Sequence, residues 1–487
     1  MLAVFISLFS FLSLQEAPTP ASSVEAADTV WKSNVQRRLT DSTGHFLKVN
    51  RIVLVGNAIT RDRILLRELS LKSGDVVYSN DLKDILDLDK KKLINTRLFN
   101  TVEIKSLPFS KEEVDLVVSV NERWYTFPSP IFELADRNFN EWWENYEHDF
   151  RRVNYGLRLY QFNMRGRNET LRLVAQLGFY RKFEINYKIP YFDKKQKQGL
   201  IFDFEYSETK NAPVLTDEHK LDFLEDDHVI RVHRGGSVAY TYRNSFYDHH
   251  VLKAEFRSNS IADTVTEVNP NYFGEGERLQ RYTVLSYQFT SDHRDYFGYP
   301  LNGYYFNTIV SKSGIFRRDD LDKFEITASY AKFFNLGKNY YLSNNIIGFW
   351  STPDRQPYNA FGAMGYRKQF IRGYEVYVVE GPTYFLNKTT FKKRIFSKTY
   401  DWKSIAIRQF RHIPLSIYIK MYGDFGYVQN YPIYEETNKN TLLSNRFLTG
   451  AGVGLDVVGS YDAVIRFEYS FNVMGVGGFF IHLKREF

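Results

Sequence analysis

The sequence predicts a mainly β protein, a 16-stranded antiparallel transmembrane β-barrel preceded by one small β-α-α-β-β domain. Aromatic residues make up 17% of the chain, yet the mean hydropathy is only −0.40. After the N-terminus there is no run of about 20 apolar residues, the length that a membrane-spanning helix needs. Beyond Arg123, apolar and polar residues alternate with a period of two. This combination is typical of a barrel whose alternate residues face lipid and whose interfaces carry aromatic girdles.

The N-terminus predicts a signal peptide over residues 1–27. Residues 2–14 are almost entirely apolar, and small residues follow up to Ala27, as in a cleaved secretion signal. No Lys or Arg precedes the apolar stretch, so a short N-terminal helix or anchor is the alternative. The polar residues 28–47 are expected to form a linker.

Residues 48–123 predict the small α+β domain. A β-rich run ends at the turn pair Gly56-Asn57, and Thr60 is placed to cap a helix. Gly74-Asp75 ends that helix, and Ser79 or Asn80 is placed to cap a second one. The expected elements are a strand at 51–55, helices near 64–69 and 82–93, and strands at 99–104 and 114–120.

Residues 124–487 predict the barrel. The segments 153–159, 171–179 and 465–471 each carry apolar residues on one face and mostly polar residues on the other. One strand cannot distinguish a β-sandwich, with its polar face outside, from a barrel with its polar face inside. About 360 residues at about 22 per strand and connection give roughly 16 strands. Antiparallel closure would leave no open edge, as lipid requires.

Several function classes find no support in the sequence. The chain has no cysteine, so it has neither disulfides nor Cys-based metal sites. The charges that sum to +7 are scattered, which does not predict nucleic-acid binding. Nucleophile-elbow, phosphate-loop and zinc-protease motifs are missing from the sequence. The pair His249-His250 is only a weak candidate for a metal site. Taken together, these observations lead us to expect no enzyme, no cofactor and no metal.

Four short motifs stand out in the predicted barrel, at residues 292–303, 371–374, 423–426 and 450–455, before a last strand that ends at Phe487. With the order of motifs in residues 48–123, this set resembles the BamA/TamA-type outer-membrane assembly and translocation barrels. Residues 48–123 resemble one polypeptide-transport-associated (POTRA) domain of that surface-antigen family. The chain would be a reduced member with a single POTRA domain. The segment 387–394 lacks a glutamate that the resemblance implies there.

The resemblance implies insertion of proteins into the bacterial outer membrane or translocation of polypeptides across it. Unfolded outer-membrane or secreted proteins would be the clients, the lipid bilayer would surround the barrel, and periplasmic or lipoprotein subunits would assist. The small domain would lie in the periplasm. The alternative is a passive pore or structural scaffold barrel with a periplasmic docking domain.

The motif Ile371-Arg372-Gly373-Tyr374 predicts a loop lock in the barrel lumen. If the long loop folds back inside, Arg372 becomes a partly buried cation that needs an anion, and Asp424 on a neighbouring strand is a bidentate candidate. Gly373 would permit a close backbone approach or a positive φ, and Tyr374 would pack beside them. Two unrelated surface charges are the alternative interpretation.

The two ends of the barrel carry the expected mechanism. Phe479, Ile481, Leu483 and Phe487 share one face of the last strand, which is expected to face lipid and resembles the C-terminal signal of outer-membrane barrels. The first strand, near residues 127–134, would close on the last. If that seam is weak, an incoming strand can pair with the open edge. The segment 114–120 is expected to offer a second free edge.

Overall fold

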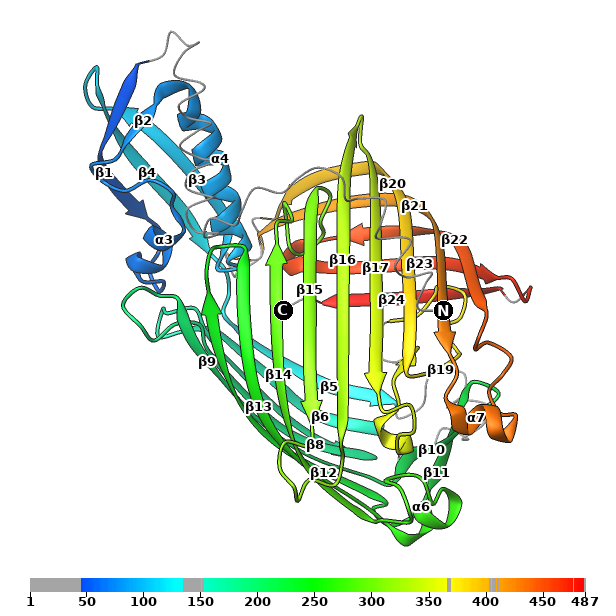
Figure 1. Cartoon of the computed structure of the whole chain (residues 1–487). Coiled ribbons are helices and arrows are strands. Elements are labelled where there is room, and N and C mark those ends of the chain that lie inside the picture. Colours follow the sequence, from blue (N-terminus) through cyan, green and yellow to red (C-terminus); the bar gives the residue numbers. More distant parts are fainter. Residues whose placement is uncertain are drawn as a thin grey trace, which may run out of the picture.

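The computed structural model describes residues 45–134, 150, 153–365, 369–402, 404, 409, 411–475 and 477–485. The expected signal peptide, most of the linker and Phe487 lie outside these residues. A small α+β domain stands at one end of a 16-stranded antiparallel sheet that curls into a barrel (Figure 1). The predicted fold class is confirmed.

The small domain packs two helices against a four-stranded sheet with the order β2-β1-β4-β3. Its core is apolar and includes Ile64 and Leu93 from the helices and Val118 from the sheet, all fully buried. The buried apolar residues recur at helical or strand spacing, and for this reason the helices and most strands of the domain could be predicted from the sequence. The elements are β1 (Phe46–Val55), α3 (Asp62–Glu68), β2 (Val76–Tyr78), α4 (Ser79–Asn95), β3 (Phe99–Pro108) and β4 (Glu113–Glu122).

Three details of this domain differ from the sequence expectations. Thr60 does not cap α3, because its hydroxyl donates to the buried carboxylate of Glu122 at 2.6 Å. Helix α4 begins at Ser79, and no side chain caps it. The segment 114–120 is not a free edge, because β4 lies between β1 and β3. The long edge strand is β3, which local patterns could not reveal because sheet order depends on distant pairings.

The barrel sheet runs from β5 to β24 in chain order, with every neighbouring pair antiparallel. The longest connections, such as those between β9 and β12, β13 and β14, β17 and β20, and β21 and β22, lie at the end away from the small domain (Figure 1). The strands are β5 (Thr126–Leu134), β6 (Val153–Met164), β7 (Glu169–Gly178), β8 (Tyr180–Ile189), β9 (Gln198–Thr209), β12 (Arg231–Arg243), β13 (Asp248–Ile261), β14 (Leu279–Asp292), β15 (Gly303–Ser313), β16 (Lys323–Gly337), β17 (Tyr340–Thr352), β20 (Thr383–Asp401), β21 (His412–Gln429), β22 (Phe447–Val458), β23 (Ala463–Asn472) and β24 (Gly477–Arg485).

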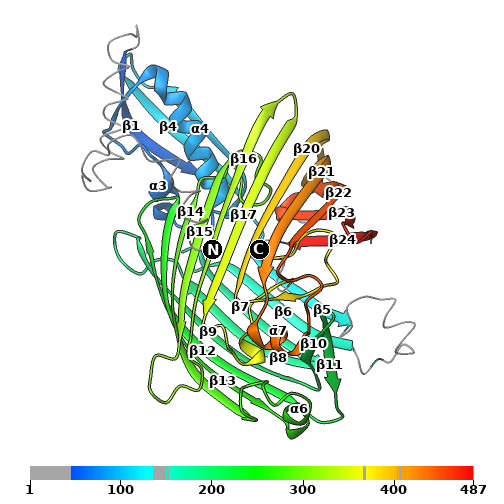
Figure 2. The same cartoon turned by 45° about the vertical axis from the view of Figure 1, so that its right-hand side comes forward.

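The long loops carry their own short elements, which gather at the end of the barrel opposite the small domain (Figure 2). A hairpin rises from the connection between β9 and β12, and its tip residue His219 is buried. The amide of Leu443 donates to His219 Nε2 at 2.9 Å, so two loops far apart in the chain close over one another. These elements are β10 (Asn211–Asp217), β11 (Lys220–Glu225), α6 (Asp263–Val268), η2 (Tyr358–Ala360), β18 (Ala363–Met364), β19 (Val379–Glu380), α7 (Pro432–Thr437) and, in a turn at the other end, η4 (Ser460–Asp462).

The lumen and lipid faces alternate along the barrel strands, as β21 shows. In β21, Tyr418, Lys420, Tyr422 and Asp424 are buried inside the barrel, whereas Ile419 and Met421 between them are at least half exposed. A polar inner face and an apolar outer face are the arrangement that a lipid bilayer requires. Within the described residues, no helix has both the length and the apolar character needed to cross a membrane.

The barrel sheet begins and ends at the first and last barrel strands of the chain. Strands β5 and β24 are the terminal members of the strand order, and the described residues contain no ladder between them. Both strands stand beside the opening in Figure 2, where β5 is cyan and β24 is red. Among the described residues the expected cylinder therefore shows no hydrogen-bonded closure between β5 and β24, and we call this boundary the seam.

Met421→Arg tests the lipid face. A cation at the centre of that face should destabilise the barrel by about 2–4 kcal/mol, because the charged group is moved from water into lipid, where no anion is placed to pair with it. Urea unfolding of the barrel in lipid vesicles measures the loss. Met421→Leu is the matched control and should change little, and equal stability of both variants would contradict the assignment of this face.

Candidate functional site

The connection between β17 and β20 folds back into the barrel lumen. Residues 371–374 of this loop are buried, and Ile371 and Tyr374 are at most 2% exposed. Both pack in one apolar cluster with Leu386 and Leu448 from the barrel wall. A loop between two strands is usually solvated, so this burial requires specific partners for the polar groups that it carries.

Arg372 and Asp424 lie together inside the barrel. The Arg372 guanidinium donates to both carboxylate oxygens, from Nη2 to Oδ1 at 2.6 Å and from Nε to Oδ2 at 2.8 Å. The backbone amide of Arg372 also donates to Oδ2, at 3.1 Å. Thr390 Oγ1 accepts from Nη2 at 3.0 Å, and the guanidinium lies 3.7 Å from the centre of the Tyr422 ring. Such a planar, bidentate arrangement is geometrically specific to arginine.

A second carboxylate approaches the guanidinium from β23. Glu468 Oε1 lies 3.7 Å from Arg372 Nη1 and 2.8 Å from Lys420 Nζ, and Lys420 also pairs with Asp456. The strand that was expected to carry a glutamate is β20, which holds Thr390 beside Arg372 instead. Positive and negative side chains thus alternate along the inner wall of the barrel. Their mutual attraction offsets the free-energy cost of removing each charge from water.

Glycines let the loop backbone lie directly on the barrel wall. Gly373 has φ +98°, a conformation that side chains with Cβ rarely adopt. A Cβ at Gly450 in β22 would stand 1.9 Å from the carbonyl oxygen of Arg372. The Asn472 amide holds the Gly373 carbonyl from the other side at 2.7 Å. The glycine motif at 450–455 and the loop motif at 371–374 therefore form one contact.

The last strand presents part of its expected face. Phe479 and Ile481 point away from the lumen, with more than half of each side chain exposed. The side chain of Leu483 and all of Phe487 lie outside the described part of the chain. The outer-face pattern of the described half of β24 is the one that lipid requires.

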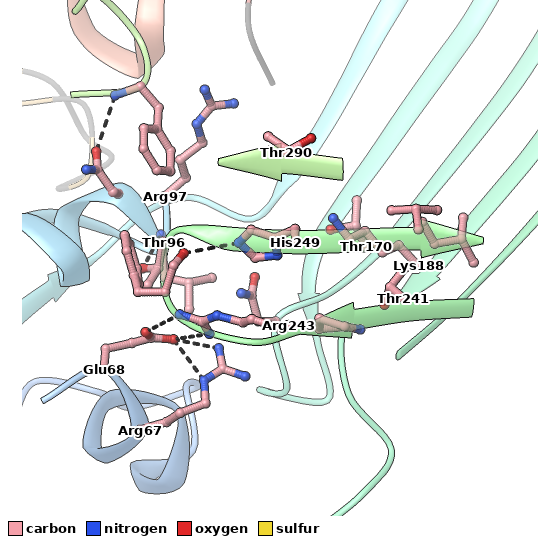
Figure 3. Close-up of a pocket in the computed structure, with 18 of the residues that line it drawn as sticks. Arg67, Glu68, Thr96, Arg97, Thr170, Lys188, Thr241, Arg243, His249 and Thr290 are labelled. Carbon is pink, nitrogen blue, oxygen red and sulfur yellow. Dashed lines mark hydrogen bonds and ion pairs between the residues drawn. The ribbon is translucent and has the colours of Figure 1, made fainter. Parts of the chain in front are cut away.

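The small domain is docked across the mouth of the barrel by a buried ion pair. Arg243, at the end of β12, donates to both carboxylate oxygens of Glu68 in α3, at 2.8 and 2.6 Å. Arg67 approaches the same carboxylate at 2.6 Å. Figure 3 shows the guanidinium groups of Arg67 and Arg243 both directed at the Glu68 carboxylate. Burial alone would raise the pKa of Glu68, but the hydrogen bond from Arg243 and the charges of both arginines hold its pKa below the ordinary value.

Other turns of the barrel bind the same domain. Arg123 pairs with Asp462 of the β22–β23 turn at 3.2 Å, and the Asn95 amide donates to the Asp295 carbonyl at 3.3 Å. Asn163 donates to Thr60 at 2.8 Å. The motif at 292–303 is thus the β14–β15 turn that meets the small domain. Beside these contacts lies a cavity of about 550 Å³, lined by residues that include Arg97, Lys188, Thr241 and His249 (Figure 3).

Sequence reasoning did not find Glu68, Arg243 or Asp462. Glu68 carried one signal, because it is a charged residue beside the apolar positions of a helix that must be buried on that side. Its partner Arg243 is 175 residues away, and Asp462 is 339 residues from Arg123. No local spacing connects such pairs.

Comparisons with known proteins agree with this architecture. A family model described as an Omp85 superfamily domain matches residues 163–477, and a POTRA model, described as a surface antigen variable number repeat, matches residues 47–123. The outer membrane protein assembly factor BamA of Nitratidesulfovibrio vulgaris is 37% identical over 76 residues, which are 15% of this chain and 9% of that relative.

Two solved structures share the fold. BamA from Haemophilus ducreyi lacking POTRA domains 1–3 superposes with a TM-score of 0.50 at 14% identity, over 90% of this chain and 83% of that one. CdiB from Escherichia coli superposes with a TM-score of 0.52 at 11% identity, over 90% of this chain and 74% of that one.

Replacing Arg372 by Ala should release the loop from the wall. The change leaves Asp424 buried without its cation, and breaking a buried pair costs about 3–5 kcal/mol. Hydrogen exchange at residues 371–381 should become faster while the barrel stays assembled. Arg355→Ala is the control, because Arg355 belongs to the same loop but pairs with Glu436 in solvent, where ion pairs contribute little. Unchanged exchange in Arg372→Ala would contradict the lock.

Docking of the small domain should weaken at acidic pH. Because the pKa of Glu68 is lowered in the docked state, its contribution is complete above the ordinary glutamate range and is lost as the pH falls through the lowered pKa. Spin labels at Lys83 and Lys338 measure the separation of domain and barrel. Glu68→Gln should separate them at neutral pH, whereas Glu103→Gln on the exposed surface should not. A docked fraction that ignores both pH and Glu68→Gln would refute this role.

Proposed function

The chain belongs to the Omp85 superfamily, whose model matches more than half of its length, and we propose that it inserts β-barrel proteins into the bacterial outer membrane or translocates polypeptides across it. The barrel spans the outer membrane, and the POTRA domain lies in the periplasm. The match to a relative named as an outer membrane protein assembly factor supports this proposal. So does a fold shared with BamA and CdiB.

The observation that carries the proposal is the seam between β5 and β24. A strand edge in hydrocarbon leaves backbone N–H and C=O groups without partners, and neither lipid nor water is there to satisfy them. A strand of a client protein supplies these partners by β-augmentation. Main-chain hydrogen bonds do not depend on which side chains a strand carries. One seam can therefore accept unfolded outer-membrane or secreted proteins of many sequences.

The POTRA domain offers the client a first contact. Its strand β3 is a sheet edge whose outer half, from Lys105 to Pro108, is exposed. An extended chain that pairs there is held beside the barrel mouth, because Glu68, Asn95 and Arg123 fix the domain to the barrel turns. Periplasmic or lipoprotein subunits would bind the remaining faces of this domain.

The loop that carries Arg372 stabilises the barrel wall on the β24 side of the seam. It lies against β22 and contacts β23, and β23 is the neighbour of β24 in the sheet. Pinning the loop therefore stiffens one side of the seam while the other side is free to move. The proposed cycle of pairing and release exchanges hydrogen bonds only and makes or breaks no covalent bond.

Removal of residues 48–123 should leave a membrane barrel that no longer handles clients. The measurement compares the outer-membrane proteomes of three strains, which contain the whole chain, the shortened chain or no copy of the protein. The abundance of the same client proteins should fall in the strain with the shortened chain and in the strain without the protein, because the barrel alone cannot capture clients. The matched control is Asp87→Asn on the exposed surface of α4, away from the edge strand β3.

Two outcomes would contradict the proposed function. Outer membranes that keep every protein at its normal level without the chain would remove assembly and translocation together. A large, stable, ion-selective conductance in a planar bilayer, combined with that unchanged proteome, would identify a passive pore instead.

A further inference from the structure

The two edges of the seam differ in the hydrogen bonds that they can make. The first strand, β5, contains Pro128 and Pro130, and the described last strand, β24, contains no proline. A proline nitrogen carries no hydrogen, so it cannot donate to a neighbouring strand. Within sheets, proline is largely confined to edge strands for this reason.

The register with β6 shows which way the two prolines face. Pro128 is opposite Leu159 and Pro130 is opposite Leu157, in a ladder without any irregularity. Alternate residues of a strand direct their backbone groups to opposite sides. Because this ladder needs donors, β5 must supply them from the odd-numbered residues such as Ser129, and the backbone of Pro128 and Pro130 faces the open seam.

The free edge of β5 therefore lacks two consecutive donors. A strand that paired along it would leave two of its own carbonyl oxygens without a hydrogen in a region where lipid offers none. Pro128 and Pro130 stand in the half of β5 next to the POTRA domain, because the strand begins at Thr126 directly after that domain. This half of the seam is the one that a chain arriving from the domain meets first.

The edge of β24 has a full set of donors, and the strand is paired with its neighbour β23. Each of its nine residues has a backbone N–H, and β24 pairs with β23 along its whole length. His482 Nε2 lies 3.3 Å from Glu468 Oε2, and Glu468 belongs to the charges around Arg372. The strand with a hydrogen-bond donor at every residue, β24, is thus also the strand whose His482 lies beside Glu468, next to Arg372.

We propose that an incoming β-strand of an unfolded outer-membrane barrel pairs with β24, and that β5 is a blunt edge that neither templates the client nor zips closed on β24. This inference rests on the proposed function, because it specifies which edge of the same seam the client uses. The prolines thereby keep the POTRA-proximal half of the seam open between clients.

A photo-crosslinking phenylalanine analogue can test the choice of edge. It replaces Phe132 in β5 or Phe479 in β24, two outward-facing and exposed side chains. The probe is the urea-denatured precursor of an eight-stranded outer-membrane barrel, added to the full-length protein in vesicles. We expect about tenfold more crosslink from position 479, because pairing at β5 leaves carbonyls unsatisfied in lipid.

Restoring the donors should change that preference. In Pro128→Val/Pro130→Val, crosslinking from position 132 should rise to within about twofold of position 479, since both edges can now donate along their length. Ser129→Thr, which keeps both prolines, is the matched control and should behave as the unchanged protein. The chain has no cysteine, so a double variant with Phe132→Cys and Phe479→Cys gives a second test without any client. It reports whether a short bis-maleimide, which adds one thiol at each end, bridges the seam more often once the prolines are gone.

The outcomes separate the two proposals. Equal or stronger crosslinking from β5 in the unchanged protein would overturn the inference and leave the proposed function in place. Bridging of the two cysteines that the proline replacements do not alter would also overturn it. No crosslink from either edge, while the precursor inserts no faster than into empty vesicles, would overturn the proposed function and the inference with it.

Discussion

The requirement that every backbone polar group in a bilayer find a partner governs this molecule. It explains why sixteen strands form one continuous antiparallel sheet and why apolar and polar residues alternate along each strand. Between β5 and β24 the described residues show no such pairing, so a new strand could supply hydrogen-bond partners there. The same rule that builds the barrel therefore marks the position of its proposed activity.

Inside the lumen a second constraint acts, the cost of holding charge away from bulk water. Arg372 satisfies it through Asp424, with Glu468 and Lys420 continuing the alternation along the wall. At Arg372 the loop is consequently held both by the charge of its side chain and by the close approach of its backbone to Gly450 of β22. Neither contact alone would explain why a long loop lies inside the barrel.

Much of this fold was legible from the sequence because its signals are local. Period-two alternation and strand length predicted sixteen strands, and helical spacing predicted α3 and α4. The contact between Arg372 and Asp424 could be anticipated because residues 371–374 resemble the loop signature of the family and because a buried arginine needs an anion. The role of that contact as a lock stays a prediction. Thr60 was misread as a cap because its partner, Glu122, is 62 residues away. Sheet order in the POTRA domain, the Glu68–Arg243 pair and the seam depend on contacts between distant segments that no window of sequence contains.

The position of Glu468 has an evolutionary consequence. Its carboxylate reaches Arg372 from β23, although the family resemblance implies an acidic residue on β20. Electrostatic attraction depends on distance and burial rather than on which strand supplies the charge. Selection on such a site would preserve the local sum of charges while the acidic residue migrates from strand to strand. Related chains should consequently show exchanged pairs of substitutions at these positions, and an alignment that scores each column separately would mistake them for loss.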